Sequence, residues 1–428
     1  MKISILAWRN VITNPLNLVL NIILFGLGVG LISFLLLFNE QLKDKFDNNL
    51  AGIDLVVGAK GSPLQLILCS MYHIDNPTGN IPIKNAAPVL RPNHPLIKKA
   101  IPLSLGDNYK GYRIVGTNHD IIELYGGKLD SGVLYKNSME VTIGKAVAEE
   151  TNLSIGDKFS SAHGFEDDQD LTHDHASFIV TGILTGTGSV LDQLILTNTA
   201  SVWEVHEHHG EQDASEEHDH ATHDENDGHE DHLHDNSNAD LLQHPDQEIT
   251  SVLIQYKNRT NFQALNFGRN INENTEMQAA SPAIEINRLY SMIGVGTDTL
   301  RSLAIIIAIV SALSIFISLY RSMKERKYEL ALLRVMGASR IKIFMLIILE
   351  GLMLAAIGYF FGGLVSHLSM EWMAGYLKSD FRYSFSGWVF LEEEWMLLGI
   401  SLIIGFIAAI IPAIQAARSD IHQILSEK

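Results

Sequence analysis

The sequence contains a single cysteine, Cys69, in 428 residues, so no disulfide bond can form within the chain. A lone thiol also lacks the paired spacing of zinc and redox motifs, and we interpret Cys69 as a small buried apolar residue. Basic residues are scarce as well, because 31 Lys and Arg stand against 49 Asp and Glu, for a net charge of −18. Proteins bind phosphate backbones through Lys and Arg, so this balance argues against nucleic acid as a partner.

Charged residues are almost absent from four long stretches, residues 16–38, 296–320, 341–364 and 395–414. A bilayer core about 30 Å thick needs about 20 apolar residues in a helix, so we predict four transmembrane helices. The first stretch is longer than the core of a signal peptide, and no clear small-residue cleavage site follows it. We therefore interpret it as an uncleaved membrane anchor.

The basic residues gather between the second and third apolar stretches. Residues 321–340 and their border hold seven of them: Arg321, Lys324, Arg326, Lys327, Arg334, Arg340 and Lys342. Because Lys and Arg accumulate in cytoplasmic loops, this segment should lie in the cytoplasm. Residues 1–15, expected to form an amphipathic helix on the inner surface, and the tail 415–428 fall on the same side. Residues 39–290 and the short loop 365–394 are then extracytoplasmic.

The large region 39–290 mixes short strand patterns with helical ones. Strands are predicted at 112–116, 140–144, 177–184, 193–197 and 251–256, and helices at 145–151 and 261–273. The predicted fold class is thus an α-helical membrane protein with four transmembrane helices and an α+β extracytoplasmic domain between helices 1 and 2. The stretch around Lys60 has the wrong residue order for a Walker loop. We expect no enzyme activity in this chain, and any ATPase activity belongs to a separate subunit.

A block rich in histidine and acidic residues interrupts the α+β region. Residues 204–235 contain nine histidines among thirteen Asp and Glu: His206, His208, His209, His218, His220, His223, His229, His232 and His234. The low apolar content predicts a disordered insertion at 204–248. Neutral imidazole binds Zn²⁺, Cu²⁺ and Ni²⁺, so we expect many weak sites for zinc or another divalent transition metal and no tightly bound cofactor. A solvated acidic loop without a metal role, and pH sensing, are the alternatives.

One ionisable residue, Glu350, lies inside the third apolar stretch, where a carboxylate indicates a function or a buried partner. Asn21 in the first stretch is the nearest polar candidate for that partner, and the sequence leaves open whether Glu350 serves packing or coupling. Small residues in the same two stretches allow helices to approach closely. They are Gly26, Gly28 and Gly30 in the first stretch, and Gly358, Gly362 and Gly363 in the third.

Three segments, residues 6–17, 325–351 and 411–425, resemble the FtsX-like permeases of the MacB and LolC/LolE type. The first is similar to the cytoplasmic amphipathic helix of that family, and the third to its ending, in which a proline closes the last span. The second is similar to its coupling-loop signature. Within that signature six residues fall at family positions: Glu329, Ala331, Leu332, Arg334, Gly337 and Ala338.

The resemblance implies a MacB-like periplasmic core domain and a location in the cell inner membrane. It implies two permease chains paired with two ABC ATPase subunits. The segment 321–340 would dock on the ATPase through Arg326, Glu329, Arg334, Gly337 and Ala338. The alternatives are a non-transporting mechanotransducer that regulates a periplasmic partner, and a lipoprotein-releasing permease. The histidine block departs from the family pattern and favours a link to metal transport, while the substrate and its direction stay open.

Overall fold

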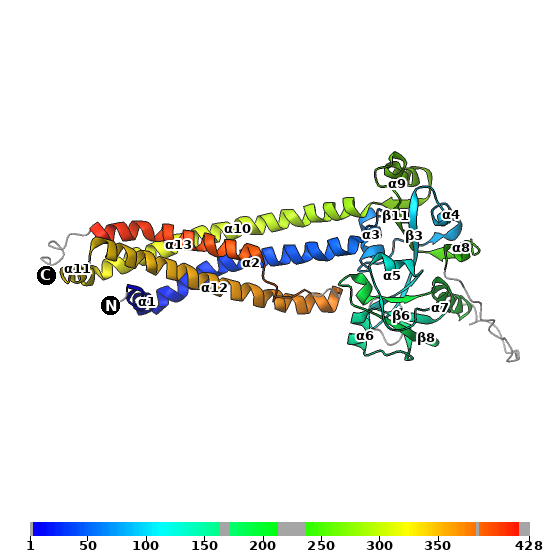
Figure 1. The fold of residues 1–428 in the computed structure, drawn as a ribbon, viewed down its shortest axis with the longest axis horizontal. Coiled ribbons are helices and arrows are strands. Elements are labelled where there is room, and N and C mark those ends of the chain that lie inside the picture. The colour runs from blue at the N-terminus through cyan, green and yellow to red at the C-terminus, as the bar shows by residue number, and fades with distance from the viewer. Residues whose placement is uncertain (1–2, 163–171, 213–236, 382–384, 419–428) are drawn as a thin grey trace. The chain divides into compact units, whose positions relative to one another are not determined.

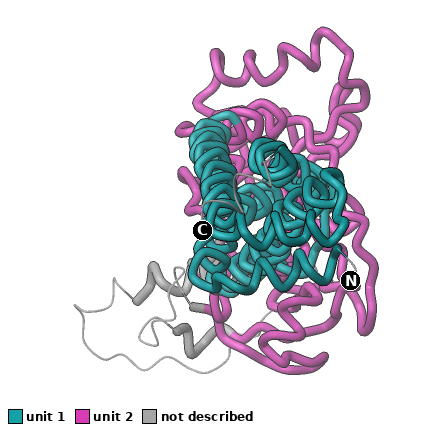
Figure 2. Tube along the Cα trace, turned by 90° about the vertical axis from the view of Figure 1, so that its left-hand side faces the viewer, with its two compact units in different colours: residues 1–43, 291–428 teal, residues 44–290 magenta. Residues whose placement is uncertain are grey.

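The computed structural model describes residues 3–162, 172–212, 237–381 and 385–418. The chain divides into two compact units, which Figure 2 shows in different colours. Residues 1–43 and 291–428 form the first, here called the helical unit, and residues 44–290 form the second, the α/β unit. The predictions made above for residues 213–236 and 419–428 concern parts of the chain outside the described residues.

The helical unit contains the apolar stretches. Its helices, labelled in Figure 1, are α1 (Ile3–Thr13), α2 (Pro15–Leu50), α10 (Pro282–Glu325), α11 (Lys327–Val335), α12 (Arg340–Phe381) and α13 (Glu392–Arg418), of which α2 and α10 continue into the other unit. Among the described residues, α2, α10, α12 and α13 are long and apolar enough to cross a membrane. Helix α12 continues to Phe381 through much of the expected loop 365–394, since residues beyond the apolar run still favour a helix.

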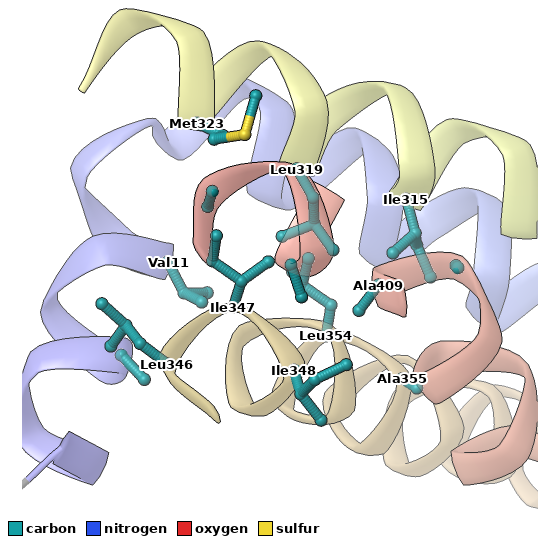
Figure 3. Close-up of a cluster of buried hydrophobic side chains, with 14 of the residues drawn as sticks. Val11, Ile315, Leu319, Met323, Leu346, Ile347, Ile348, Leu354, Ala355 and Ala409 are labelled. Carbon is teal, nitrogen blue, oxygen red and sulfur yellow. The ribbon is translucent and has the colours of Figure 1, made fainter. Parts of the chain in front are cut away.

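A proline separates the first two helices. Helix α1 ends at Thr13, and Pro15 is the first residue of α2, a position where its missing N–H costs no helical hydrogen bond. Helix α1 buries Ala7 and Val11 against the other helices. Figure 3 shows Val11 near Leu346 and Ile347 of α12, and these side chains belong to one apolar cluster that also includes α10 and α13.

Glycines set the closest helix contacts in this unit. A methyl group on Gly362 of α12 would lie 2.5 Å from the carbonyl oxygen of Gly26 and 2.9 Å from the amide nitrogen of Gly30, both in α2. A methyl group on Gly405 of α13 would lie 2.5 Å from the Cβ of Ala355 in α12. Small residues in membrane helices allow backbones to approach in this way, and van der Waals contact then stabilises the bundle.

The α/β unit is built on a mixed sheet. Its strands are β1 (Leu55–Ala59), β2 (Ile81–Pro82), β3 (Ile97–Tyr109), β4 (Tyr112–Thr117), β5 (Leu129–Gly132), β6 (Glu140–Ile143), β7 (Lys158–Ala162), β8 (Thr172–Leu184), β9 (Ile195–Thr197), β10 (Glu248–Ile249), β11 (Ser251–Tyr256) and β12 (Met277–Ala280). Among the described residues, ten strands form one sheet in the order β12-β1-β11-β3-β4-β9-β6-β8-β5, with β7 pairing β3 and β8. The β4–β9 and β6–β8 pairs are parallel, and β10 pairs β2 separately.

Short helices complete the unit. They are α3 (Pro63–Met71), α4 (Ile83–Leu90), α5 (Asp120–Leu124), α6 (Lys145–Thr151), α7 (Thr199–Gln212), α8 (Asn238–Leu241) and α9 (Phe262–Asn274), with a 3-10 turn, η2, at Val190–Gln193. The five strands and two helices predicted from the sequence are confirmed to within a few residues. Helix α6 ends where Asn152 adopts the left-handed conformation, with φ 59°.

The expected disordered insertion 204–248 has structured flanks. Residues 204–212 continue α7, and residues 238–241 form α8, in which Leu241 is buried within an apolar cluster of the α/β unit. Ser237 caps α8 by accepting a hydrogen bond from the Asp240 N–H at 3.3 Å. The disorder predicted from composition is therefore wrong for these two flanks, which are helical.

A side chain hydrogen-bonds the outer edge of the sheet at β12. Strand β12 lies at one end of the sheet, and Asn272 of the neighbouring helix α9 contacts the Ala279 peptide group twice. Its Oδ1 accepts a hydrogen bond from the Ala279 N–H at 2.6 Å, and its Nδ2 donates to the Ala279 carbonyl at 3.0 Å. The outward-facing backbone of β12 is thus satisfied at this residue.

Candidate functional site: the helix α11 junction

The expected coupling segment 321–340 is mostly helical. The long helix α10 ends at Glu325 because Arg326 leaves the helical conformation, with φ −104° and ψ 18°. Helix α11 follows and ends before Gly337, whose φ of +96° lies in the left-handed region that glycine adopts without strain. A side chain at Gly337 would meet no other atom within 4 Å, so the conformation, and not space, requires glycine there.

Helix α11 has two apolar faces. Leu330 and Ala331 are buried, and Leu330 belongs to the apolar cluster of the helical unit that includes residues of α12. Tyr328, Leu332 and Val335 are spaced four and three residues apart, so they share the other face, and all three are exposed. Such a short helix is marginal alone, so packing of its inner face is what orders the exposed one.

Four polar side chains meet at the start of α11. Arg326 Nη2 lies 3.2 Å from Glu350 Oε1 of α12, and Asn10 Nδ2 of α1 donates to the same oxygen at 2.6 Å. Arg326 Nε lies 3.9 Å from Glu329 Oε2, one turn into α11. The Glu350 and Arg326 side chains are 5% and 15% exposed, whereas that of Glu329 is 72% exposed. The structure therefore turns Arg326 inward and Glu329 outward.

A small polar cavity adjoins Glu350. Its polar lining comes from Asn10 of α1, Asn14 between α1 and α2, Asn17 and Asn21 of α2, and Ser318 and Ser322 of α10. Its volume of about 30 Å³ has room for a single water molecule, and its walls offer the polar partners a water needs. Asn21, the expected partner of Glu350, instead accepts a hydrogen bond from Ser314 of α10 at 2.8 Å.

A second buried polar cluster lies elsewhere in the helical unit. His367 Nε2 of α12 is 3.0 Å from Glu394 Oε1 of α13, and Ser33 of α2 donates to the same oxygen at 2.9 Å. Tyr359 donates to the Glu394 backbone carbonyl at 2.9 Å. Sequence reasoning missed this cluster because His367 and Glu394 fell in the expected loop 365–394, where polar residues need no partner.

The α/β unit buries a cluster of titratable groups. Burial raises the pKa of the Cys69 thiol to about 11, and burial lowers the pKa of the Arg113 guanidinium beside it. Burial, aided by the positive charge of Arg113, lowers the pKa of His73 to about 3. The interpretation of Cys69 as a buried residue is confirmed. These shifts disfavour a thiolate and a charged imidazole, so the cluster is built for packing and not for nucleophilic chemistry.

The predicted metal ligands divide between two parts of the chain. His206, His208 and His209 belong to the backbone of α7, while the other six, at 218, 220, 223, 229, 232 and 234, lie outside the described residues. Within the parts of the chain that the structure describes, no group of three or more His, Cys, Asp or Glu could hold a metal ion. The metal hypothesis therefore still rests on composition.

Comparison with known proteins bears on the helical unit above all. No curated protein matches the chain. Among solved structures, the extracellular domain of the noncanonic ABC-type transporter YknZ from Gram-positive bacteria matches with 12% identity and a TM-score of 0.27, over 54% of this chain and 98% of that one. The FtsX-like permease C-terminal family model matches residues 301–421, which hold the last part of α10 together with α11, α12 and α13. Residues 301–421 are therefore similar to the C-terminal domain of FtsX-like permeases, as the resemblance implied.

Proposed function

We propose that the chain is the membrane subunit of an ABC transporter of the MacB/LolC type, and that α11 docks on a separate ATPase subunit. The exposed face of α11 carries this proposal. A permease domain and four apolar helices support a place in the membrane. A partner of α11 on the cytoplasmic side then agrees with the seven basic residues around it.

The chemistry of the exposed face suits a protein partner. Tyr328, Leu332 and Val335 offer a compact apolar patch, and Met336 beyond the helix is also exposed. Glu329 and Arg334 add one charge of each sign to the same short helix. Apolar anchors flanked by charges are typical of protein interfaces, where the anchors supply affinity and the charges orient the partner.

Movement of α11 has two covalent routes into the chain. Arg326 joins it to α10. Helix α10 is continuous from Pro282, which closely follows the end of β12, to Glu325. The Gly337 turn joins it to α12. In the proposed cycle, closure of two ATPase subunits on ATP shifts α11, and the α/β unit, placed in the periplasm by the charge pattern, changes its arrangement in response. A second permease chain would complete the assembly.

The work performed by that movement has three candidate forms. Transport or extrusion of a substrate fits the permease family, and we favour it. A lipoprotein-releasing permease and a mechanotransducer that regulates a periplasmic partner would use the same α11 contact. The histidine-rich block supports a link to zinc or another transition metal, because nine imidazoles in about thirty residues provide many ligands.

The test compares two exposed leucines. The tagged full-length chain is purified in detergent from its native membrane, and the co-purifying ATPase and its ATP hydrolysis are measured. Leu332→Ser should reduce both about tenfold, since one apolar anchor is worth at least about 1.4 kcal/mol at an interface. Leu265→Ser on the exposed face of α9, outside the apolar stretches and far from α11 in the sequence, is the matched control and should change neither. Equal ATPase recovery with both variants would remove α11 as the docking element.

A further inference from the structure

We infer that Arg326 is a positioning residue that passes force from the docking face of α11 to α12 without touching the partner. The inference rests on the proposed function and assigns a new role within it. Arg326 stands between the exposed carboxylate of Glu329 and the buried carboxylate of Glu350. The three side chains form a line of alternating charge from the surface of α11 into the helical unit.

Burial separates Arg326 from the docking residues. Its side chain is 15% exposed, against 72% for Glu329, so a partner that reaches Glu329 cannot reach the guanidinium to the same extent. Arg326 also occupies the residue where α10 stops and α11 starts, so its backbone moves with any tilt of α11. A tilt that displaces Arg326 must stretch its 3.2 Å contact with Glu350 or carry α12 along.

The surroundings of Glu350 favour movement of α12 over separation of Arg326 from Glu350. Glu350 is almost fully buried in an apolar stretch, where a carboxylate without a positive partner is strongly disfavoured. Asn10 of α1 donates to the same oxygen at 2.6 Å, which fixes the carboxylate from a second side. Arginine suits this role because its planar guanidinium keeps its charge and donates in several directions at once. Separating the pair is thus costlier than moving α12 and α1 together.

A nearby ion pair provides a contrast. Arg321 and Glu325 lie four residues apart on α10, with Arg321 Nε 2.8 Å from Glu325 Oε1, and both side chains are exposed. This pair connects two turns of one helix and therefore passes no force between helices. Arg321→Gln is accordingly the matched control for Arg326→Gln.

The experiment separates coupling from stability and from docking. Arg326→Gln, Glu350→Gln, the double variant and Arg321→Gln are purified as full-length chains with the co-purifying ATPase. Three quantities are measured: the amount of bound ATPase, its hydrolysis rate relative to wild type, and the thermal midpoint of the chain. Arg326→Gln should lower the midpoint because it leaves Glu350 buried without a counter-charge, and the double variant should restore most of that loss.

The decisive comparison is hydrolysis in the double variant. We expect bound ATPase to stay at the wild-type level in all variants, while stimulated hydrolysis falls about tenfold in Arg326→Gln and stays low in the double variant. Hydrolysis restored together with the midpoint would show a structural role only and overturn the inference. Loss of bound ATPase with Arg326→Gln would make it a docking residue, which also overturns it. Absence of any ATPase from the wild-type chain would instead refute the proposed function.

Discussion

The two units differ in the partners that they give to buried ionisable side chains. In the helical unit Glu350 and Glu394 are each held by a cationic or imidazole partner and by a neutral donor from a third helix. In the α/β unit His73 is buried with a low pKa, and its Nδ1 contacts no hydrogen-bond partner among the described residues. A neutral imidazole tolerates this position, whereas a protonated one would be expensive.

His73 should make the stability of the chain depend on pH. Its pKa in the folded state, about 3, lies below the ordinary value of about 6.5, so between these values the unfolded chain binds more protons and stability falls as pH falls. From pH 7.5 to 5.5 the loss should be about 1.4 kcal/mol. Unfolding of the full-length protein in detergent at both pH values measures it.

The control for this prediction is His73→Asn. Asparagine accepts the left-handed backbone of this residue, with φ 54°, and does not titrate in the range. The free energy of unfolding of wild type should fall by about 1.4 kcal/mol more than that of the variant over the same pH step. A pH dependence of the same size in both proteins would assign it to other groups.

Helix contacts in the helical unit depend on which side of a helix each glycine faces. Of the glycines noted in the sequence, Gly26, Gly30, Gly358 and Gly362 lie where α2 and α12 touch, whereas a methyl group on Gly363 would meet nothing within 4 Å. Composition marks all of them as small residues, and only the packing of the helices tells them apart. Neighbouring glycines with opposite surroundings make a direct comparison feasible.

Gly362→Ala and Gly363→Ala should have opposite effects on stability. The added methyl at Gly362 would lie 2.5 Å from a backbone oxygen of α2, so the helices must separate, at a cost of about 1–3 kcal/mol. At Gly363 the methyl meets open space, and alanine favours the helix by about 0.5–1 kcal/mol. Thermal unfolding in detergent should rank Gly363→Ala above wild type and Gly362→Ala below it. Equal midpoints for the two variants would contradict the close contact of α2 and α12.

Across the whole chain, sequence patterns predict individual helices and strands but not the contacts between residues far apart in the sequence. Apolar length marks the four long helices, and short runs of strand-forming residues bounded by turn signals mark β4, β6, β8, β9 and β11. Strand order depends on pairings such as β1 with β11, whose residues lie about two hundred positions apart, and no pattern in either strand encodes that choice. The partners of Glu350 come from α1 and from the α10–α11 junction for the same reason.

The histidine-rich block allows a test of its chemistry in the intact chain. Replacing the six histidines between residues 218 and 234 by asparagine removes imidazole ligands and leaves every carboxylate in place. Zinc titration of the full-length protein by calorimetry should then lose most of its bound equivalents, because imidazole nitrogen is the preferred ligand in this segment. Zinc binding that survives the replacement would assign the ions to the groups that remain, the carboxylates or His206, His208 and His209.

The hydrogen bonds of the Asn272 amide also affect whether a strand of another chain can add to the sheet. A foreign strand that approached β12 would find the N–H and C=O of Ala279 already hydrogen-bonded, which disfavours its pairing with the sheet at this residue. The opposite end, β5, has four residues and closes with Gly132 at φ +82°, which leaves a template too short and too bent for stable addition. Among the described residues, each end strand of the sheet is thus only four residues long, and in β12 the backbone of one of the four is already hydrogen-bonded.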